Sequence, residues 1–279
     1  MGLLSGLREL WAETLGDPAV CIAVLDGPVD LSHPSLKGAN LTTGETLVPG
    51  APDLGPACRH GTHVASVIFG RHEGLVPGVA PRCRGVLLPI FQSLGEQSIQ
   101  PCSQLDLARA ITQAVQQGAH VVNISGGQFS PSGTAHPLLA DVVRDCARRG
   151  TLIVAAAGND GCACLHVPAA LDSVLAVGAM GARGEPLGSS NWGGPYGIQG
   201  IVAPGVDILG AQPGDGTARA TGTSYATALV SGVAALLVSL QRKRGQPPSP
   251  LLVREALLRS AIGCDQQLRI SAQINFPIR

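Results

Sequence analysis

The sequence predicts an α/β protein with a doubly wound, mostly parallel sheet that carries helices on both faces. Short apolar runs of strand length alternate along the chain with longer segments of helical period, and no internal repeat is visible. The chain is 45% hydrophobic but only 3% aromatic, and it contains 37 glycines. A core of small aliphatic side chains with many tight turns suits strands that are buried on both faces, as parallel strands are.

The length of the chain indicates one large domain, and its charge argues against some classes of partner. The 279 residues suffice for one large domain, expected over residues 19–279, with a docked N-terminal helix in residues 1–18. The 19 basic and 19 acidic residues give a formal net charge of zero, so we expect neither nucleic acid nor a membrane as a partner. No apolar stretch combines transmembrane length with suitable flanks. Arg8, Glu9 and Glu13 interrupt any signal-peptide core, which predicts a cytoplasmic protein.

The first predicted elements are the N-terminal helix and a buried strand over residues 21–25. The helix is predicted from the helical spacing of its apolar side chains, which are Leu3, Leu4, Leu7, Leu10 and Trp11. The strand ends on Asp26, and the carboxyl ends of strands are where open α/β sheets usually carry their active sites. A plain surface turn is the alternative, and Gly27-Pro28 fits both.

Two histidines open the next predicted helix, over residues 60–68. Before it, residues 31–59 are rich in turn formers and predict a surface excursion with at most short strands. His60 and His63 fall in the first turn at i and i+3, so they share a face and could ligate a metal. No Glu, Asp or Cys supplies a third ligand at a usual spacing. We therefore interpret His63 as a general base rather than as a metal ligand.

The remaining elements complete the alternation of strands and helices. Strands are expected over residues 86–90, 119–124, 152–157, 174–177 and 201–203, and helices over residues 103–117, 137–149, 222–240 and 251–262. Ser125-Gly126-Gly127 follows the strand over residues 119–124. Its glycines could leave backbone groups open to an extended peptide, although a plain loop is the alternative.

Ser224 lies at the start of the predicted helix over residues 222–240, directly after Gly222-Thr223. The first N–H groups of a helix lack intrahelical partners and lie at its positive end. A serine there can attack a carbonyl while its own N–H helps to hold the resulting oxyanion. The helix is apolar nearly all round, which predicts that it is buried. A core helix with a Thr or Ser cap is the alternative interpretation.

Asp26, His63 and Ser224 occur in the order of one known arrangement of the nucleophilic triad. The segments around them resemble the signature blocks of the subtilisin-like serine peptidases: 24–27, 60–65 and 222–227. Residues 123–127, 155–159 and 203–205 resemble further blocks of that family. The resemblance covers about residues 20 to 240 and implies a subtilisin-like fold and a hydrolase that needs neither metal nor organic cofactor.

Roles for individual residues follow from this chemistry and from the resemblance. His63 would take the proton of the Ser224 hydroxyl, and Asp26 would orient and stabilise the imidazole. Asn159 matches the amide of the family's oxyanion hole, and Ser125-Gly126-Gly127 resembles the edge that pairs with the substrate main chain. Gly27-Pro28 and Tyr225 depart from the family's usual Thr-Gly and Met, which could alter a subsite.

Within this family the chain is most similar to the proteases that mature cyanobactins, ribosomally made cyclic peptides of the patellamide type. Residues 24–30, 158–170 and 189–193 carry the similarity. Such pathways use one hydrolase that removes the leader and a second subtilase, with a helical insertion near its catalytic histidine, that joins the ends. Residues 31–59 have neither the length nor the period of a helix pair, which favours leader removal from a precursor peptide. The alternatives are a general degradative protease, the joining enzyme and an inactive peptide-binding module.

The eight cysteines give no clear pattern. Cys162 and Cys164 lie near His166, but their spacing is too short for the usual zinc knuckle. We interpret them as structural cysteines or as partners of distant cysteines, and eight cysteines allow too many connectivities to name a pair.

Overall fold

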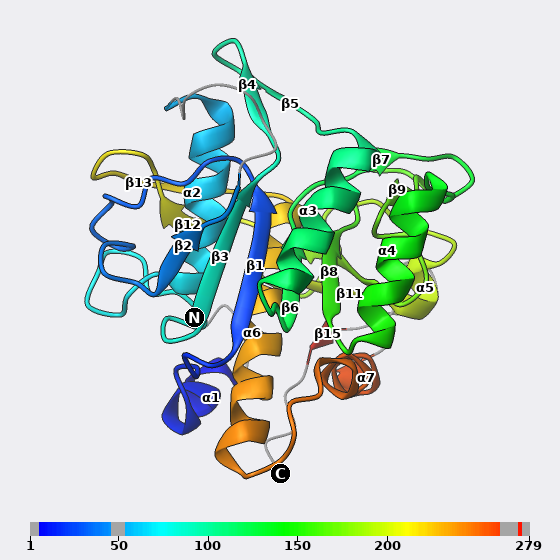
Figure 1. The fold of residues 1–279 in the computed structure, drawn as a ribbon. Helices are drawn as coiled ribbons and strands as arrows, with labels where there is room; N and C mark the ends of the chain where they lie inside the picture. Colours follow the sequence, from blue (N-terminus) through cyan, green and yellow to red (C-terminus); the bar gives the residue numbers. More distant parts are fainter. Residues whose placement is uncertain (1–5, 46–53, 263–272, 275–279) are drawn as a thin grey trace.

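The computed structural model describes residues 6–45, 54–262 and 273–274, and Figure 1 shows their arrangement. The helices are α1 (Leu7–Glu13), α2 (Pro56–Phe69), α3 (Gln104–Gln116), α4 (Pro137–Arg148), α5 (Tyr196–Gln199), α6 (Thr223–Lys243) and α7 (Pro250–Ser260). The strands of the main sheet are β1 (Cys21–Asp26), β2 (Leu41–Thr43), β3 (Arg84–Pro89), β6 (Val121–Ile124), β8 (Leu152–Ala156), β10 (Leu175–Met180), β11 (Gly200–Pro204), β14 (Ala261–Ile262) and β15 (Gln273–Ile274).

The predicted doubly wound parallel sheet is confirmed. Its strand order is β14-β15-β11-β10-β8-β6-β1-β3-β2, and all neighbours from β2 to β15 pair in parallel. Only β14 runs antiparallel, against β15. Three short antiparallel pairs lie outside this sheet: β4 (Gln92–Leu94) with β5 (Ser98–Gln100), β7 (Gln128–Phe129) with β9 (His166–Val167), and β12 (Ile208–Ala211) with β13 (Thr217–Ala220).

Each face of the sheet carries its own hydrophobic core. Along β1 the buried side chains alternate, so Ile22 and Val24 face the core with α1, α2, α6 and α7. Ala23 and Leu25 face the core with α3 and α4 on the other side. Figure 1 shows α3 and α4 on one face of the sheet and α6 crossing the other. This two-sided burial explains why the strands are continuous apolar runs.

Helix α6 runs through the centre of one core. It has transmembrane length and a mean hydropathy of 1.6, but 83% of that window is buried inside the domain. Small residues let it approach its neighbours closely: a Cβ added at Gly232 would lie 2.6 Å from Val79 Cβ. The predicted burial of this helix is therefore confirmed, and Ser224 stands in its first turn.

Most predicted elements appear with ends shifted by a few residues, and α2 differs in a way that matters for the site. It begins at Pro56, because proline is favoured at the first helical position, so the last part of the predicted excursion is already helical. His60 and His63 therefore lie beyond the first turn where the sequence analysis placed them. In the described part of that excursion the strand is the three-residue β2, and residues 46–53 lie outside the described residues.

The predicted N-terminal helix is observed as α1, in which Leu7 and Leu10 are buried. The Trp11 indole N–H donates to the Val79 carbonyl at 2.8 Å and ties the helix to the core. Leu3 and Leu4 lie outside the described residues. The last predicted helix is α7, which ends at Ser260 and is followed by the short strand β14.

Candidate active site

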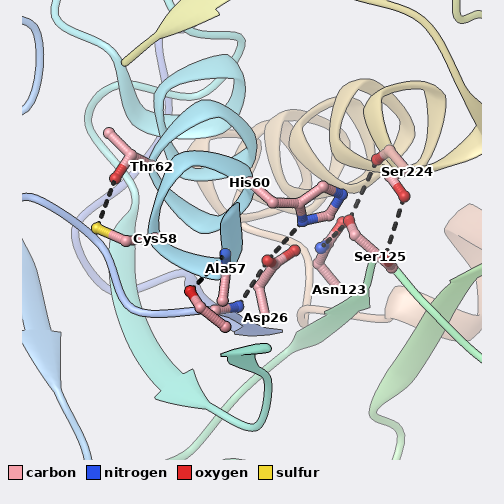
Figure 2. Close-up of polar contacts among 10 residues, drawn as sticks. Asp26, Ala57, Cys58, His60, Thr62, Asn123, Ser125 and Ser224 are labelled. Carbon is pink, nitrogen blue, oxygen red and sulfur yellow. Dashed lines mark hydrogen bonds and ion pairs between the residues drawn. The ribbon is translucent and has the colours of Figure 1, made fainter. Parts of the chain in front are cut away.

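The sheet brings the candidate residues to one edge. Asp26 ends β1, Ser125 follows β6, and Asn159 follows β8, and these three strands are parallel neighbours. Their carboxyl ends therefore meet at the same edge. Ser224, at the start of α6, lies at this edge as well. In Figure 2 the imidazole of His60 lies between the Asp26 carboxylate and the Ser224 hydroxyl.

Asp26 is paired with His60. The Nδ1 of His60 lies 2.7 Å from Asp26 Oδ1, which also accepts a 2.6 Å hydrogen bond from the Gly27 N–H. Asp26 is 1% exposed, so this carboxylate is held in a dry environment. Close contact between α2 and the end of β1 makes the pairing possible, because a Cβ at Gly61 would collide with the Gly27 carbonyl. Helix α2 is thereby pressed against the residue that follows Asp26.

The surroundings of His60 favour its protonated form. Burial lowers the pKa of His60, but the charge of Asp26 and its hydrogen bond outweigh that effect, so the net shift is upward. An imidazole with this partner has a stabilised charged form and a fixed tautomer, with Nδ1 carrying the proton toward the carboxylate. Nε2 is then left to accept a proton. These are the properties of a general base.

The prediction that His63 is the partner of Asp26 is wrong. Three residues along a helix correspond to an axial rise of about 4.5 Å, so only one of the two histidines reaches the end of β1. His63 is 3% exposed, and its ring lies 4.5 Å from that of Tyr225. Within the described residues its Nε2 has no hydrogen-bond partner. Burial, and then the charge of His60, lower the pKa of His63 to about 4, so it is a neutral packing residue.

One signal in the sequence could have distinguished the two histidines. His60 is followed directly by Gly61, and only a glycine there allows the backbone of α2 to touch the turn after β1. His63 instead precedes Val64, which is buried in the core. A histidine beside the close-contact glycine is the one that can reach a side chain on the strand.

Ser224 is fixed to the end of β6 by reciprocal hydrogen bonds. Its hydroxyl donates to the Ser125 carbonyl at 3.0 Å, and the Ser125 hydroxyl donates to the Ser224 carbonyl at 3.1 Å. The Asn123 amide donates to the Ser125 hydroxyl at 2.9 Å (Figure 2). Hydrogen bonds between a nucleophile and its base often tighten only when substrate binds. The serine is therefore positioned beside the base with its hydroxyl held by a carbonyl.

Asn159 presents an amide next to Ser224. Its Oδ1 accepts a 2.9 Å hydrogen bond from the Thr223 N–H in the first turn of α6. Because the amide oxygen is occupied in this way, the Nδ2 donors remain for another acceptor. The Ser224 N–H belongs to the same helix terminus, whose N–H groups lack intrahelical partners. Together the two groups can hold a developing oxyanion, the role that the sequence analysis predicted for Asn159.

Ser125-Gly126-Gly127 runs between β6 and β7 as an extended loop. A Cβ at Gly126 would lie 2.6 Å from the Phe91 ring, so a larger residue there would have to displace that ring. Across the described part of the chain, no backbone hydrogen bond joins Gly126 or Gly127 to another segment. Their backbone groups could pair with an extended peptide, and that role stays a prediction.

The described residues contain no group of three or more His, Cys, Asp or Glu side chains that could hold a metal ion. Cys162 and Cys164 form a disulfide with each other. Neither cysteine therefore pairs with a distant cysteine, which was one of the two interpretations, and the disulfide spans a single intervening residue.

The sequence profile of the subtilase family matches residues 17–274. The M-protease of Shouchella clausii (strain KSM-K16) is 35% identical over 245 residues, which are 88% of this chain and 59% of that protein. The chain thus spans less than two thirds of the length of this relative.

Solved structures match over nearly their full length. The prenylagaramide maturation protease PagA is 49% identical, with a TM-score of 0.89 and coverage of 98% of this chain and 96% of that one. The patellamide maturation protease PatA is 53% identical, with a TM-score of 0.85 and coverage of 93% and 95%. The PatG macrocyclase domain has a TM-score of 0.87 but only 32% identity, with coverage of 98% and 94%.

Proposed function

We propose that this chain, which belongs to the subtilase family of serine proteases, is an endopeptidase that removes the leader from a ribosomal precursor peptide. The observation that supports an endopeptidase most directly is the hydrogen-bonded pair of Asp26 and His60 beside Ser224 at the start of α6. Leader removal is supported by the 49% and 53% identity to two maturation proteases, compared with 32% to the PatG macrocyclase domain.

The reaction proceeds through an acyl-enzyme. Ser224 Oγ attacks the carbonyl carbon of the scissile bond while His60 Nε2 takes the hydroxyl proton. The tetrahedral oxyanion accepts hydrogen bonds from the Asn159 amide and the Ser224 N–H. His60 then gives its proton to the leaving amine as the C–N bond breaks. Water then attacks the ester carbon while His60 takes one of its protons. As the C–O bond to Ser224 breaks, His60 returns this proton to Ser224 Oγ and the peptide acid leaves.

Hydrolysis and cyclisation share the acyl-enzyme and differ in what attacks it. A segment that keeps water from the acyl-enzyme would have to cover His60 and Ser224. Between β1 and α2, the described residues contain only the three-residue β2 and no helix; residues 46–53 are outside this description. This supports access of water to the ester and therefore a linear product.

The test is incubation with a precursor peptide followed by mass spectrometry. We expect a linear leader and a linear core whose masses sum to that of the precursor plus one water. A core product lighter than the linear core by one water would show a joining enzyme instead. Rapid cutting of casein at many sites would show a general degradative protease. Absence of fluorophosphonate labelling on a folded wild type would show an inactive peptide-binding module, and Ser224→Ala is the control for labelling.

A cytoplasmic location is a further part of the proposal. Helix α1 supports it, because Leu7 and Leu10 are buried in the domain core rather than available as an export signal. Fractionation of cells that express the chain tests this, and recovery outside the cytoplasm would contradict it.

A further inference from the structure

The segment that carries Asn159 is closed by the disulfide between Cys162 and Cys164. Asn159 follows β8, and Cys162 comes three residues later in the same irregular segment, which ends where β9 begins at His166. A bond between residues i and i+2 makes a small covalent ring, so the backbone from Cys162 to Cys164 cannot rotate freely. This ring lies between the oxyanion amide and the next strand of the chain.

Backbone hydrogen bonds hold both ends of the turn that contains Asn159. The Asn191 N–H donates to the Gly158 carbonyl at 3.0 Å, before the asparagine. The Trp192 N–H donates to the Cys162 carbonyl at 3.1 Å, after it. The second bond depends on the direction of a carbonyl that belongs to the disulfide ring. The ring therefore helps to fix the downstream end of the turn.

The far side of the ring is held as well. The Ser130 N–H donates to the Leu165 carbonyl at 2.8 Å, and the Leu165 side chain packs against the core that contains α3 and α4. Ala163, inside the ring, lies beside Gly193, where an added Cβ would come within 3.4 Å of Ala163 Cβ. Because both flanks are anchored, the disulfide determines the path of the chain between them.

The position of Asn159 depends on this turn rather than on burial of its own side chain. Asn159 is exposed, and its Oδ1 accepts the 2.9 Å hydrogen bond from the Thr223 N–H. An oxyanion is stabilised only if its donors lie within hydrogen-bonding distance of the place where the charge develops. A turn that is loosened at Cys162 would let the Nδ2 donor move away from that place.

The disulfide is open to chemical attack. Both of its cysteines are only half-buried, so a thiol can reach them. Other cysteines are less reactive, since burial raises the pKa of Cys83 and Cys102 to about 11 and that of Cys146 to about 12. Few of these thiols are ionised at neutral pH, and the thiolate is the reactive form. Accessible disulfides are the labile ones, and the compartment proposed above is a reducing one.

We propose that the disulfide of Cys162 and Cys164 undergoes reversible thiol–disulfide exchange with cellular dithiols, and that its oxidised form holds Asn159 where catalysis needs it. A thiolate of the dithiol attacks one cysteine sulfur, and the other sulfur leaves and takes up a proton. The second thiol of the dithiol then displaces the first cysteine. The dithiol gives up two electrons and two protons and becomes a disulfide, while both cysteines become thiols. The reduced enzyme is folded but slower.

The test measures the rate of labelling by a fluorophosphonate probe before and after reduction with dithiothreitol. Mass spectrometry of the alkylated protein shows which cysteines are thiols, and circular dichroism shows that the fold persists. Reduction lowers the labelling rate by about 10-fold, less than the loss of about 10²–10³-fold for a missing oxyanion donor, and re-oxidation restores it. Labelling needs the nucleophile, the base and the oxyanion donors, so the test does not depend on which peptide is cut.

Three variants locate the effect. The double variant Cys162→Ser/Cys164→Ser labels at the rate of the reduced wild type and does not respond to dithiothreitol. Asn159→Ala labels slowly and at one rate in both redox states, because the donor through which the disulfide acts is gone. Cys102→Ser is the matched control at a half-buried thiol outside the disulfide, and it keeps the rate and the response of the wild type.

A folded wild type that contains both thiols and still labels at the oxidised rate overturns the inference. A response that persists in Asn159→Ala also overturns it, because reduction would then act on another part of the site. If the double variant does not fold, reduction and re-oxidation of the wild type decide without it. A disulfide that stays intact in a glutathione buffer with the redox potential of the cytoplasm overturns the exchange itself.

Discussion

The assignment of the base to His60 instead of His63 predicts the pH dependence of the enzyme. A general base must be neutral to accept the serine proton, so kcat/KM falls as the pH drops through its pKa in the free enzyme. Asp26 holds the pKa of His60 above the ordinary value of 6.5, whereas that of His63 is lowered to about 4. With His60 as the base, the acid limb therefore lies above pH 6.5.

The difference is large at pH 5. A base with a pKa above 6.5 is at most about 3% neutral there, whereas a base with a pKa of about 4 is about 90% neutral. We expect kcat/KM at pH 5 to fall to about 3% of its plateau or less. The assay is initial-rate cleavage of one quenched-fluorescent peptide between pH 4 and 9, with circular dichroism at each pH to show that the fold persists.

Substitution of each histidine completes the test. His60→Ala removes the base and lowers kcat by about 10⁴–10⁶-fold. His63→Ala, the matched control, opens a gap beside Tyr225 and lowers the melting temperature but leaves kcat/KM within about 10-fold. A profile with its acid limb near pH 4, or a larger loss of kcat in His63→Ala than in His60→Ala, would refute the assignment.

Three further predictions follow from the site and the core. Asn159→Ala removes a donor to the oxyanion, so steady-state kinetics should show kcat lowered by about 10²–10³-fold with little change in KM. A loss of kcat/KM that arises from a higher KM with unchanged kcat would contradict that role. Gly232→Ala lowers the free energy of unfolding in urea by about 1–3 kcal/mol, because its new Cβ would lie 2.6 Å from Val79 Cβ; unchanged stability would show that α6 can shift. Because the pKa of His63 is depressed in the folded protein, the unfolded chain takes up a proton at this residue more readily. The free energy of unfolding is therefore highest above pH 6.5 and falls by up to about 3 kcal/mol as the pH drops toward 4. His63→Leu flattens this dependence in urea titrations at several pH values, and an unchanged slope would contradict it.

The order of strands and helices was predictable from the sequence because the signals are local. The apolar runs of β1, β6 and β8 have the length of buried strands, and the all-apolar character of α6 indicates a central helix. Asp26 and Ser224 could be singled out because each stands directly at the end or the start of such an element, whereas Asn159 was predicted from the family resemblance. Their side chains are then brought together by the parallel sheet itself.

The missed features depend on contacts between segments. Whether His60 or His63 reaches Asp26 depends on where α2 begins and how closely Gly61 packs on Gly27, and neither is a local property. The position of Tyr196 is also non-local, because its hydroxyl bonds to His166, 30 residues away, and to Ala157, 39 residues away. Periodicity and composition carry no information about such pairings.

The polar residues beneath the nucleophile are explained by the geometry of the site. Asn123 is a fully buried asparagine in the otherwise apolar strand β6, a costly placement unless its amide is satisfied. It is satisfied on both sides, since Nδ2 donates to the Ser125 hydroxyl and Oδ1 accepts from the Ser231 hydroxyl, both at 2.9 Å. Ser231 lies two turns along α6 from Ser224. The asparagine thus fixes the strand end to the helix that carries the nucleophile, so the loop that pairs with substrate and the attacking serine hold one relative position.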